Sequence, residues 1–285
     1  MNPSPMRYPG GKYKMYEFVK CLMEYNGDST YIEPFCGGAA VGMKLLQDDV
    51  VKEVIINDYD FAIYALWYSI LNKTDELCNL IEEKNVCIDE WYKQREIYSK
   101  PNDSEIVDVG FATLFLNRTN RSGIVGKAGP IGGKKQNGKY KIDCRFNKKR
   151  IISQIKDIAS YRESIQLYNM EAVDFIEKII PKTRKSFTFF DPPYYNKGVE
   201  LYVDFYTHGD HENLGRIIKR RLKNRDWIVT YDNVDAVKLI YKNIDRIDFN
   251  LRYSLQKKRV GREVLFFSPH LRRIPNEEQY LHISG

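Results

Sequence analysis

The segment with the most chemical content is Thr188 to Tyr195, which reads Thr-Phe-Phe-Asp-Pro-Pro-Tyr-Tyr. Residues that favour a strand lead into an acid, and two prolines then stop the strand and fix the backbone of the turn. The Asp191 carboxylate and the rings of Tyr194 and Tyr195 are therefore expected at the carboxyl edge of a sheet, where open α/β sheets bind ligands. A plain turn with surface tyrosines would account for the prolines only, so we interpret the segment as a reactive site.

A second segment, residues 33–40, joins an expected strand to an expected helix and reads Glu-Pro-Phe-Cys-Gly-Gly-Ala-Ala. Gly37 and Gly38 allow a ligand close to the backbone, and the helix N-terminus adds free N–H groups and positive potential. Asp58 closes the next strand, a position from which an acid can accept hydrogen bonds from the ribose of an adenosine-containing ligand. Two structural alternatives stay open: a simple tight turn, and Asp58 as the N-cap of the helix that follows.

Positive charge is concentrated in the middle of the chain. The net charge is +7, yet residues 115–150 alone hold eleven basic residues against one acid, Asp143. Six of the 18 glycines lie in the same window. A flexible basic segment suits a phosphate backbone, so a polyanion is the expected partner. A solvated basic loop without a ligand is the weaker alternative.

Alternating strand and helix patterns flank this window and must position the motifs. We expect strands at residues 29–35, 53–57, 165–168, 187–190, 227–231, 247–253 and 264–268, and helices at residues 39–47, 61–71, 172–179, 212–222 and 234–241. The stretch between them lacks strand signals and reads as helical, with Asn147 capping a helix whose isoleucines share one face. This order predicts an α/β fold with a mostly parallel sheet and an antiparallel hairpin at one end. The expected parts are 1–72, a helical basic insertion at 73–162, and 163–285.

Composition narrows the class of protein. The longest apolar run, residues 61–71, is about half a membrane span, and the N-terminus has no secretory pattern, so no membrane partner is expected. Five cysteines without CxxC pairs indicate a reduced, cytoplasmic protein. His208 and His211 lack a third ligand at suitable spacing, so we predict a helix cap and a polar surface there, and no metal site. Cys36 has no spaced histidine and is not expected to be a nucleophile.

Several motifs in order resemble one family. Asp191-Pro192-Pro193-Tyr194 resembles the catalytic motif of amino-methylating DNA methyltransferases. The other segments resemble motifs of the Dam-type DNA adenine methyltransferases: residues 7–12 (Arg-Tyr-Pro-Gly-Gly-Lys), 33–41, 56–58, 115–118, 172–175 and 230–233. The resemblance covers most of residues 7–268 and implies a Rossmann-like methyltransferase fold that uses S-adenosyl-L-methionine (SAM), with a smaller helical DNA-recognition domain.

The resemblance also assigns cofactor contacts. Asp58 would accept from the ribose diol, Asp174 from the adenine amino group, and the Phe175 N–H would meet the adenine ring. Tyr8 would pack against the cofactor or beside its sulfonium, with a core aromatic as a nearly equal alternative for that residue. The complete implied set is Tyr8, Gly10, Gly11, Lys12, Glu33, Phe35, Gly37, Gly38, Asp58, Asp174, Phe175 and Asp191.

The implied chemistry is methyl transfer to the exocyclic amino group of adenine. Asp191 and the backbone carbonyl of Pro192 would each accept one amino hydrogen, which aligns the nitrogen lone pair with the methyl group. Tyr194 would stack on the base, which must leave a double-stranded helix to reach the pocket.

DNA contacts are expected from the basic window: Asn117, Arg118, Asn120, Arg121, Lys134, Lys135, Lys139 and Lys141. Most would hold phosphates, and one or two would contact base edges. We therefore predict a site-specific, SAM-dependent DNA adenine methyltransferase that acts as a monomer or weak dimer. The alternatives are an RNA adenine methyltransferase and a catalytically silent regulator that binds SAM and DNA.

Overall fold

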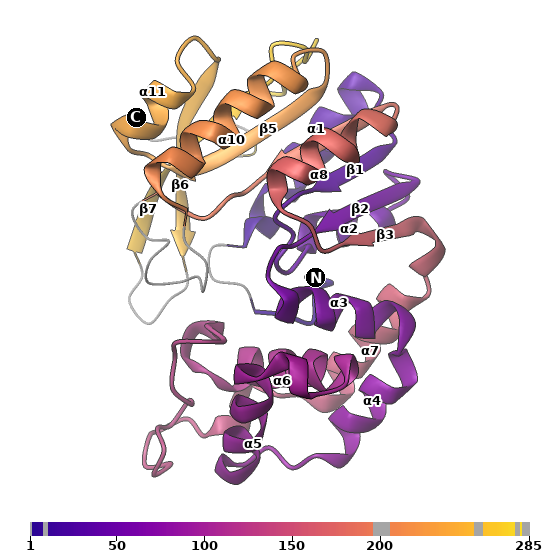
Figure 1. Ribbon diagram of the computed structural model, residues 1–285, viewed down its shortest axis with the longest axis vertical. Helices are drawn as coiled ribbons and strands as arrows, with labels where there is room; N and C mark the ends of the chain where they lie inside the picture. Colours follow the sequence, from indigo (N-terminus) through magenta and orange to yellow (C-terminus); the bar gives the residue numbers. More distant parts are fainter. Residues whose placement is uncertain (1, 8–10, 196–205, 254–258, 277–279, 281–285) are drawn as a thin grey trace. The chain divides into compact units, whose positions relative to one another are not determined.

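The chain forms two compact units in the computed structural model, which describes residues 2–7, 11–195, 206–253, 259–276 and 280 (Figure 1). The first, here the helical unit, comprises Met1–Gly11 and Asp60–Glu163. The second, the sheet unit, comprises Lys12–Tyr59 and Ser164–Gly285. The helical unit therefore begins before residue 73, the start expected from the sequence, because the helix of residues 61–72 packs with it.

A seven-stranded sheet with the order β3-β2-β1-β4-β5-β7-β6 organises the sheet unit. The strands are β1 (Thr30–Glu33), β2 (Glu53–Asn57), β3 (Ile165–Tyr168), β4 (Ser186–Phe190), β5 (Asp226–Asp232), β6 (Arg246–Tyr253) and β7 (Arg259–Phe267). The first five strands pair in parallel, whereas β7 is antiparallel to both β5 and β6. The predicted parallel sheet with an antiparallel end hairpin is confirmed. Because β1, β2, β4 and β5 are parallel, their carboxyl ends meet at one edge.

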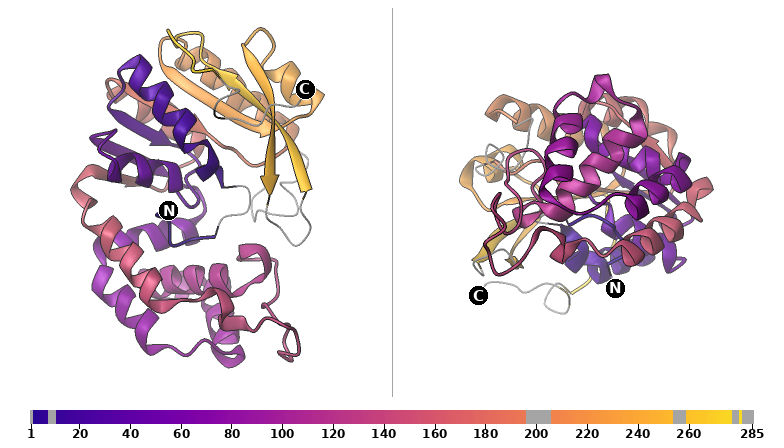
Figure 2. Two further views of the ribbon diagram at one scale, coloured as in Figure 1. Left: turned by 180° about the vertical axis from the view of Figure 1, so that it is seen from behind. Right: turned by 90° about the horizontal axis from the view of Figure 1, so that it is seen from below.

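Helices cover both faces of this sheet (Figures 1 and 2). They are α1 (Tyr16–Asn26), α2 (Ala40–Gln47), α8 (Ala172–Lys178), α10 (His208–Arg221) and α11 (Asp235–Ile240), with short 3-10 turns at Lys12–Met15, Arg162–Ser164 and Ile180–Lys182. Ile176, Ile217 and Val237 project from α8, α10 and α11 into one buried cluster with strand residues such as Phe190 and Val229. This apolar layer fixes the strand ends that carry the polar residues of the site.

The helical unit is arranged around α6 (Ile106–Thr119), whose residues are nearly all buried. Its neighbours are α3 (Phe61–Asn72), α4 (Thr74–Glu83), α5 (Ile88–Ser99) and α7 (Lys148–Ala159), with 3-10 turns at Pro101–Asp103, Arg121–Gly123 and Ile142–Arg145. Gly110 lets α6 approach α3, since a Cβ there would lie 2.8 Å from the Ala65 carbonyl oxygen. The predicted cap of α7 is confirmed, because the Asn147 side chain accepts from the Arg150 N–H. In the described part of the chain, no helix has the length and apolar character needed to cross a membrane.

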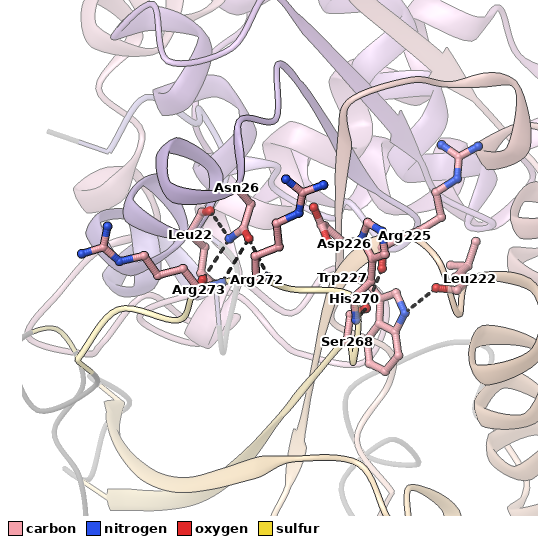
Figure 3. Close-up of polar contacts among 10 residues, drawn as sticks. All are labelled: Leu22, Asn26, Leu222, Arg225, Asp226, Trp227, Ser268, His270, Arg272 and Arg273. Carbon is pink, nitrogen blue, oxygen red and sulfur yellow. Dashed lines mark hydrogen bonds and ion pairs between the residues drawn. The ribbon is translucent and has the colours of Figure 1, made fainter.

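Polar contacts connect the segment after β7 with the amino end of the sheet (Figure 3). The Asn26 side chain, at the end of α1, accepts from the Arg272 N–H at 2.9 Å and donates to the Arg273 carbonyl at 2.9 Å. The His270 Nδ1 lies 2.8 Å from an oxygen of Asp226, the first residue of β5. These contacts lie at the sheet edge opposite the carboxyl ends.

Candidate active site

Asp191 follows β4 directly, and one of its oxygens is held from two directions. The Lys12 Nζ lies 2.7 Å from Asp191 Oδ1, and the Thr230 hydroxyl donates to the same oxygen at 2.8 Å. Lys12 lies in the 3-10 turn before α1, and Thr230 lies on β5 beside β4. The Lys12 side chain is 4% exposed and that of Asp191 is 30% exposed. Lys12 and Thr230 thus fix the Asp191 carboxylate, which is still accessible to solvent.

Tyr194 joins Asp191 in a buried polar network. Its hydroxyl accepts from the Lys12 Nζ at 3.0 Å and donates to Glu263 Oε1 at 2.6 Å. The second oxygen of Glu263 lies 3.7 Å from the same lysine nitrogen. Burial raises the pKa of Glu263 to about 6, and the Lys12 charge opposes that rise. Lys12 is therefore the cation that compensates two carboxylates in a low-dielectric site.

The turn after Tyr194 is anchored to the neighbouring strand. The Tyr195 N–H donates to Asp232 Oδ1, at the end of β5, over 2.8 Å. Asp191 and Tyr195 are thus both tied to β5, one through Thr230 and one through Asp232. With prolines at 192 and 193, the turn has little freedom to move.

The loop between β1 and α2 holds Asp58 at the end of β2. The Gly37 N–H donates to Asp58 Oδ2 at 2.8 Å, and the Cys36 Sγ lies 3.8 Å from that oxygen. Gly37 and Ala39 both have left-handed backbone conformations, with φ of 44° and 41°. Such a conformation is strained for alanine, which is typical of a functional turn. Burial and the Asp58 charge raise the pKa of the Cys36 thiol, which keeps it protonated and unreactive.

Glu33, in the same motif, is a buried acid that contacts another residue of its own strand. It is 8% exposed and accepts a hydrogen bond from Tyr31 at 2.7 Å. Burial raises its pKa to about 8, and the nearby Asp191 charge adds to the rise. Glu33 is consequently mostly neutral at pH 7.

Two aromatic side chains line the loop beside Asp58. Phe35 meets Tyr206 edge-on, with ring centroids 6.0 Å apart. Burial, followed by the charges of Glu171, Asp210 and Asp58, raises the pKa of Tyr206. Asp174 forms a half-exposed ion pair with Lys178, and Phe175 is fully buried under Tyr168.

The structure brings together only part of the site expected from the sequence. Asp191, Tyr194 and Lys12 are in direct contact, and Gly37 contacts Asp58. Gly38 is buried in the loop, while Gly11 is exposed before the first 3-10 turn. Tyr8 and Gly10 lie outside the described residues.

Three expected DNA contacts instead support the loops of the helical unit. Asn117 is fully buried, accepts from the Arg7 N–H at 2.7 Å and donates to the Arg7 and Gly123 carbonyls. Asn120 accepts from the Trp91 indole at 2.7 Å and donates to two loop carbonyls. Arg118 donates to the Arg145 carbonyl at 2.8 Å, and burial lowers its pKa to about 10.

The other cations of the basic window that are expected to contact DNA lie at the surface. These exposed residues are Arg121, Lys134, Lys135, Lys139 and Lys141. Two of them lie over tyrosine rings: the Lys134 Nζ is 5.6 Å from the Tyr92 centroid, and the Lys139 Nζ is 5.8 Å from that of Tyr140. Tyr140 itself is 61% exposed. Cations interleaved with exposed aromatic rings are typical of nucleic-acid surfaces.

Sequence reasoning missed three residues of the sheet-unit site: Glu263, Tyr206 and His211. Glu263 directly precedes the apolar run at residues 264–268, which predicts a strand. An acid next to such a run is itself a signal of a functional residue. His211 was expected on a polar surface, and this expectation is wrong, because the side chain is 1% exposed and its Nδ1 lies 2.9 Å from the Tyr231 hydroxyl. Its position in an Asp-His-Glu tripeptide gave no sign of burial.

A parallel α/β sheet with an Asp-Pro-Pro-Tyr turn at its carboxyl edge, and a basic helical unit in the same chain, define a DNA methyltransferase that modifies an amino group. The chain belongs to the D12 class N6 adenine-specific DNA methyltransferases, whose family model matches residues 8–255. It is also 28% identical over 209 residues to the Type II methyltransferase M.MjaIII of Methanocaldococcus jannaschii, covering 66% of this chain and 68% of that protein. The predictions of fold, enzyme class and adenine methylation of DNA are confirmed.

Proposed function

We propose that the methyl donor is SAM and that it lies along the loop between β1 and α2. The observation that supports this fit is a fixed carboxylate and a pair of aromatic rings at the same loop: Asp58 is held by the Gly37 N–H, and Phe35 of that loop packs against Tyr206, on which the Asp58 charge acts. A ribose diol and an adenine ring require this combination of an acceptor and apolar walls. When bound, SAM supplies an electrophilic methyl group on a sulfonium.

Further cofactor contacts come from the family motifs. Asp174 accepts from the cofactor's adenine amino group, and the Phe175 N–H meets its ring. Lys12, which the same motifs place beside the cofactor, also contacts Asp191 and Tyr194 through its ammonium group, and we propose that it fixes the catalytic carboxylate. Glu33 accepts a hydrogen bond from Tyr31 of its own strand, so its contribution to the cofactor site is through the position of the loop that follows.

Asp191 and the Pro192 carbonyl are proposed to accept the two hydrogens of the target amino group. An adenine amino nitrogen is a poor nucleophile because its lone pair is delocalised into the ring. Two acceptors in fixed positions draw that nitrogen toward tetrahedral geometry and align the lone pair for in-line displacement. The fixed Asp191 carboxylate, held through Oδ1 by Lys12 and Thr230, is the observation that carries this mechanism. As the bond between the amino nitrogen and the methyl carbon forms, the bond between that carbon and the sulfonium sulfur would break and leave a neutral thioether, and the amino group loses a proton toward Asp191.

The proposed substrate is double-stranded DNA in the cytoplasm, with the target adenine turned out of the helix and the protein acting as a monomer or weak dimer. Tyr194 then flanks the extruded base. Phosphate contacts come from Arg121 and the exposed lysines of the basic window. Asn117, Arg118 and Asn120 support that window from beneath.

The test is methylation-aware sequencing of DNA from cells that express the wild type or Asp191→Ala, together with titration of SAM into both purified proteins. A single sequence motif modified at adenine only in the wild type, with SAM affinity within a fewfold in the variant, is the expected result. Turnover by the Asp191→Ala variant would exclude the mechanism.

A further inference from the structure

We infer that His211 is a positioning residue for methyl transfer, because its imidazole fixes the tyrosines that connect the catalytic turn with the cofactor loop. This inference rests on the proposed function of those two segments. His211 lies in the first turn of α10 and is 1% exposed. No motif assigned above includes it.

Three tyrosine rings surround the imidazole. The centroid of the His211 ring lies 5.2 Å from that of Tyr195, 5.4 Å from that of Tyr206 and 5.4 Å from that of Tyr231. Tyr195 ends the catalytic turn, Tyr206 contacts Phe35 of the cofactor loop, and Tyr231 lies on β5. One side chain thus contacts the three segments that deliver residues to the site.

Tyr231 connects His211 with the groups that hold the catalytic turn. Its neighbours in β5 are Thr230, which donates to Asp191, and Asp232, which accepts from the Tyr195 N–H. The Tyr231 hydroxyl lies 2.9 Å from His211 Nδ1. A change in the orientation of the imidazole would therefore be transmitted both to the ring of Tyr195 and to the strand end that fixes its backbone.

A purely structural role would be better served by another side chain. The Nε2 atom of His211 is buried and has no hydrogen-bond partner within the described residues, which is a rare condition for a polar atom. Phenylalanine would fill the same space without burying that nitrogen. Burial lowers the pKa of His211 to about 4, against the opposing charges of Asp232 and Asp210. The imidazole is therefore neutral at working pH, and its specific contribution is the oriented hydrogen bond to Tyr231.

The chain offers matched variants for a test. Tyr231→Phe removes the hydroxyl that bonds His211, while Tyr241→Phe removes another buried hydroxyl, one without a partner among the described residues. His211→Phe keeps an aromatic ring, somewhat larger than the imidazole, and removes the hydrogen bond. For each purified protein, kcat, the KM values for SAM and DNA, and the thermal midpoint are measured with a radiolabelled methyl donor.

We expect His211→Phe and Tyr231→Phe to lower kcat about tenfold or more, since small displacements of reacting groups have large effects on rate. DNA affinity should stay within twofold, and Tyr241→Phe should behave as the wild type. A folded His211→Phe protein with wild-type kcat overturns the inference. If the His211→Phe protein does not fold, the two tyrosine variants decide the test. Equal kcat values for Tyr231→Phe and Tyr241→Phe overturn the inference. Failure of the proposed function is separate, because it would appear as turnover by Asp191→Ala or as a wild type that does not use SAM.

Discussion

The Lys12 ammonium group lies 2.7 Å from Asp191 Oδ1, although 179 residues separate the two in sequence. The same nitrogen donates to the Tyr194 hydroxyl, whose ring lies beneath it, 5.0 Å from the nitrogen to the centroid. Lys12 therefore contacts both ends of the Asp-Pro-Pro-Tyr turn. Its charge also compensates the buried Glu263, so removing it takes away the cation that the structure places beside both carboxylates.

Lys12→Met is expected to lower kcat about a hundredfold, because Asp191 loses the group that fixes its orientation. Lys44→Met is the matched control, since Lys44 also pairs with an aspartate, Asp48, and lies 5.7 Å from the centroid of a tyrosine ring. Methyl transfer rates and SAM affinities are compared for the two variants. Equal activity of both variants would contradict the assigned role of Lys12.

Thr230→Val should reduce kcat about fivefold, which corresponds to the loss of one hydrogen bond worth about 1 kcal/mol. The substitution conserves volume and removes the hydroxyl that donates to Asp191 Oδ1 at 2.8 Å and makes a longer contact of 3.4 Å with the Phe190 carbonyl. Thr113→Val in α6 is the control, because that hydroxyl bonds a carbonyl of its own helix. The prediction fails if the two valine variants have the same methyl transfer rate.

The order of elements could be read from the sequence because each strand and helix has a local signal. The strands at residues 53–57 and 165–168 match in full, since each is a short apolar run with clear limits. The start of α10 was expected at residue 212, yet it lies at His208, because Thr207 and Asp210 form a capping box. The start at residue 212 is predicted from the apolar positions of the helix, and the capping box lies before them.

The partners within the site could not be read from the sequence. The strand-to-turn pattern identified Asp191 and Asp58, since each follows a strand directly. The pairing of Lys12 with Asp191 and Glu263 depends instead on how β4, β7 and the first 3-10 turn meet in space. The burial of Asn117 and Asn120 depends in the same way on loops that fold back onto α6.

Arg121→Ala combined with Lys134→Ala is expected to weaken DNA binding and to reduce its dependence on salt. The slope of log K against log salt is negative, and each lost phosphate contact should make it shallower by about 0.9. Arg221→Ala is the control, because that arginine lies on α10 and pairs with Glu177. Fluorescence anisotropy at several salt concentrations provides the slopes, and an unchanged slope would remove these two cations from the DNA contacts.

Arg118→Ala should behave differently from those variants. Its guanidinium donates to backbone carbonyls of Arg145 and Pro5, so its loss removes two contacts that hold these loops together. We expect a lower thermal midpoint, with a salt slope for DNA binding that stays near the wild-type value. A shallower salt slope for DNA binding with an unchanged thermal midpoint would instead indicate that Arg118 contacts a phosphate directly.

Asp28 is expected to make stability depend on pH. It precedes β1 and lies beside Asp226, which contacts His270 at the sheet edge shown in Figure 3. Burial, followed by the charge of Asp226, raises the pKa of Asp28 to about 7 from 3.8. Between these two values the folded protein binds more protons than the unfolded chain, so the free energy of unfolding falls as pH rises from about 4 to 7.

Asp28→Asn removes this titration and should raise the thermal midpoint at pH 8 by a few degrees, with little gain at pH 5. The exposed Asp245 supplies the control, because Asp245→Asn removes one carboxylate charge from the same unit without removing a buried one. Melting curves are recorded from pH 5 to 8.5 for the three proteins. If the gain from Asp28→Asn is the same at every pH, the Asp28 carboxyl is not the group that titrates, and repulsion from Asp226 does not limit stability at this edge.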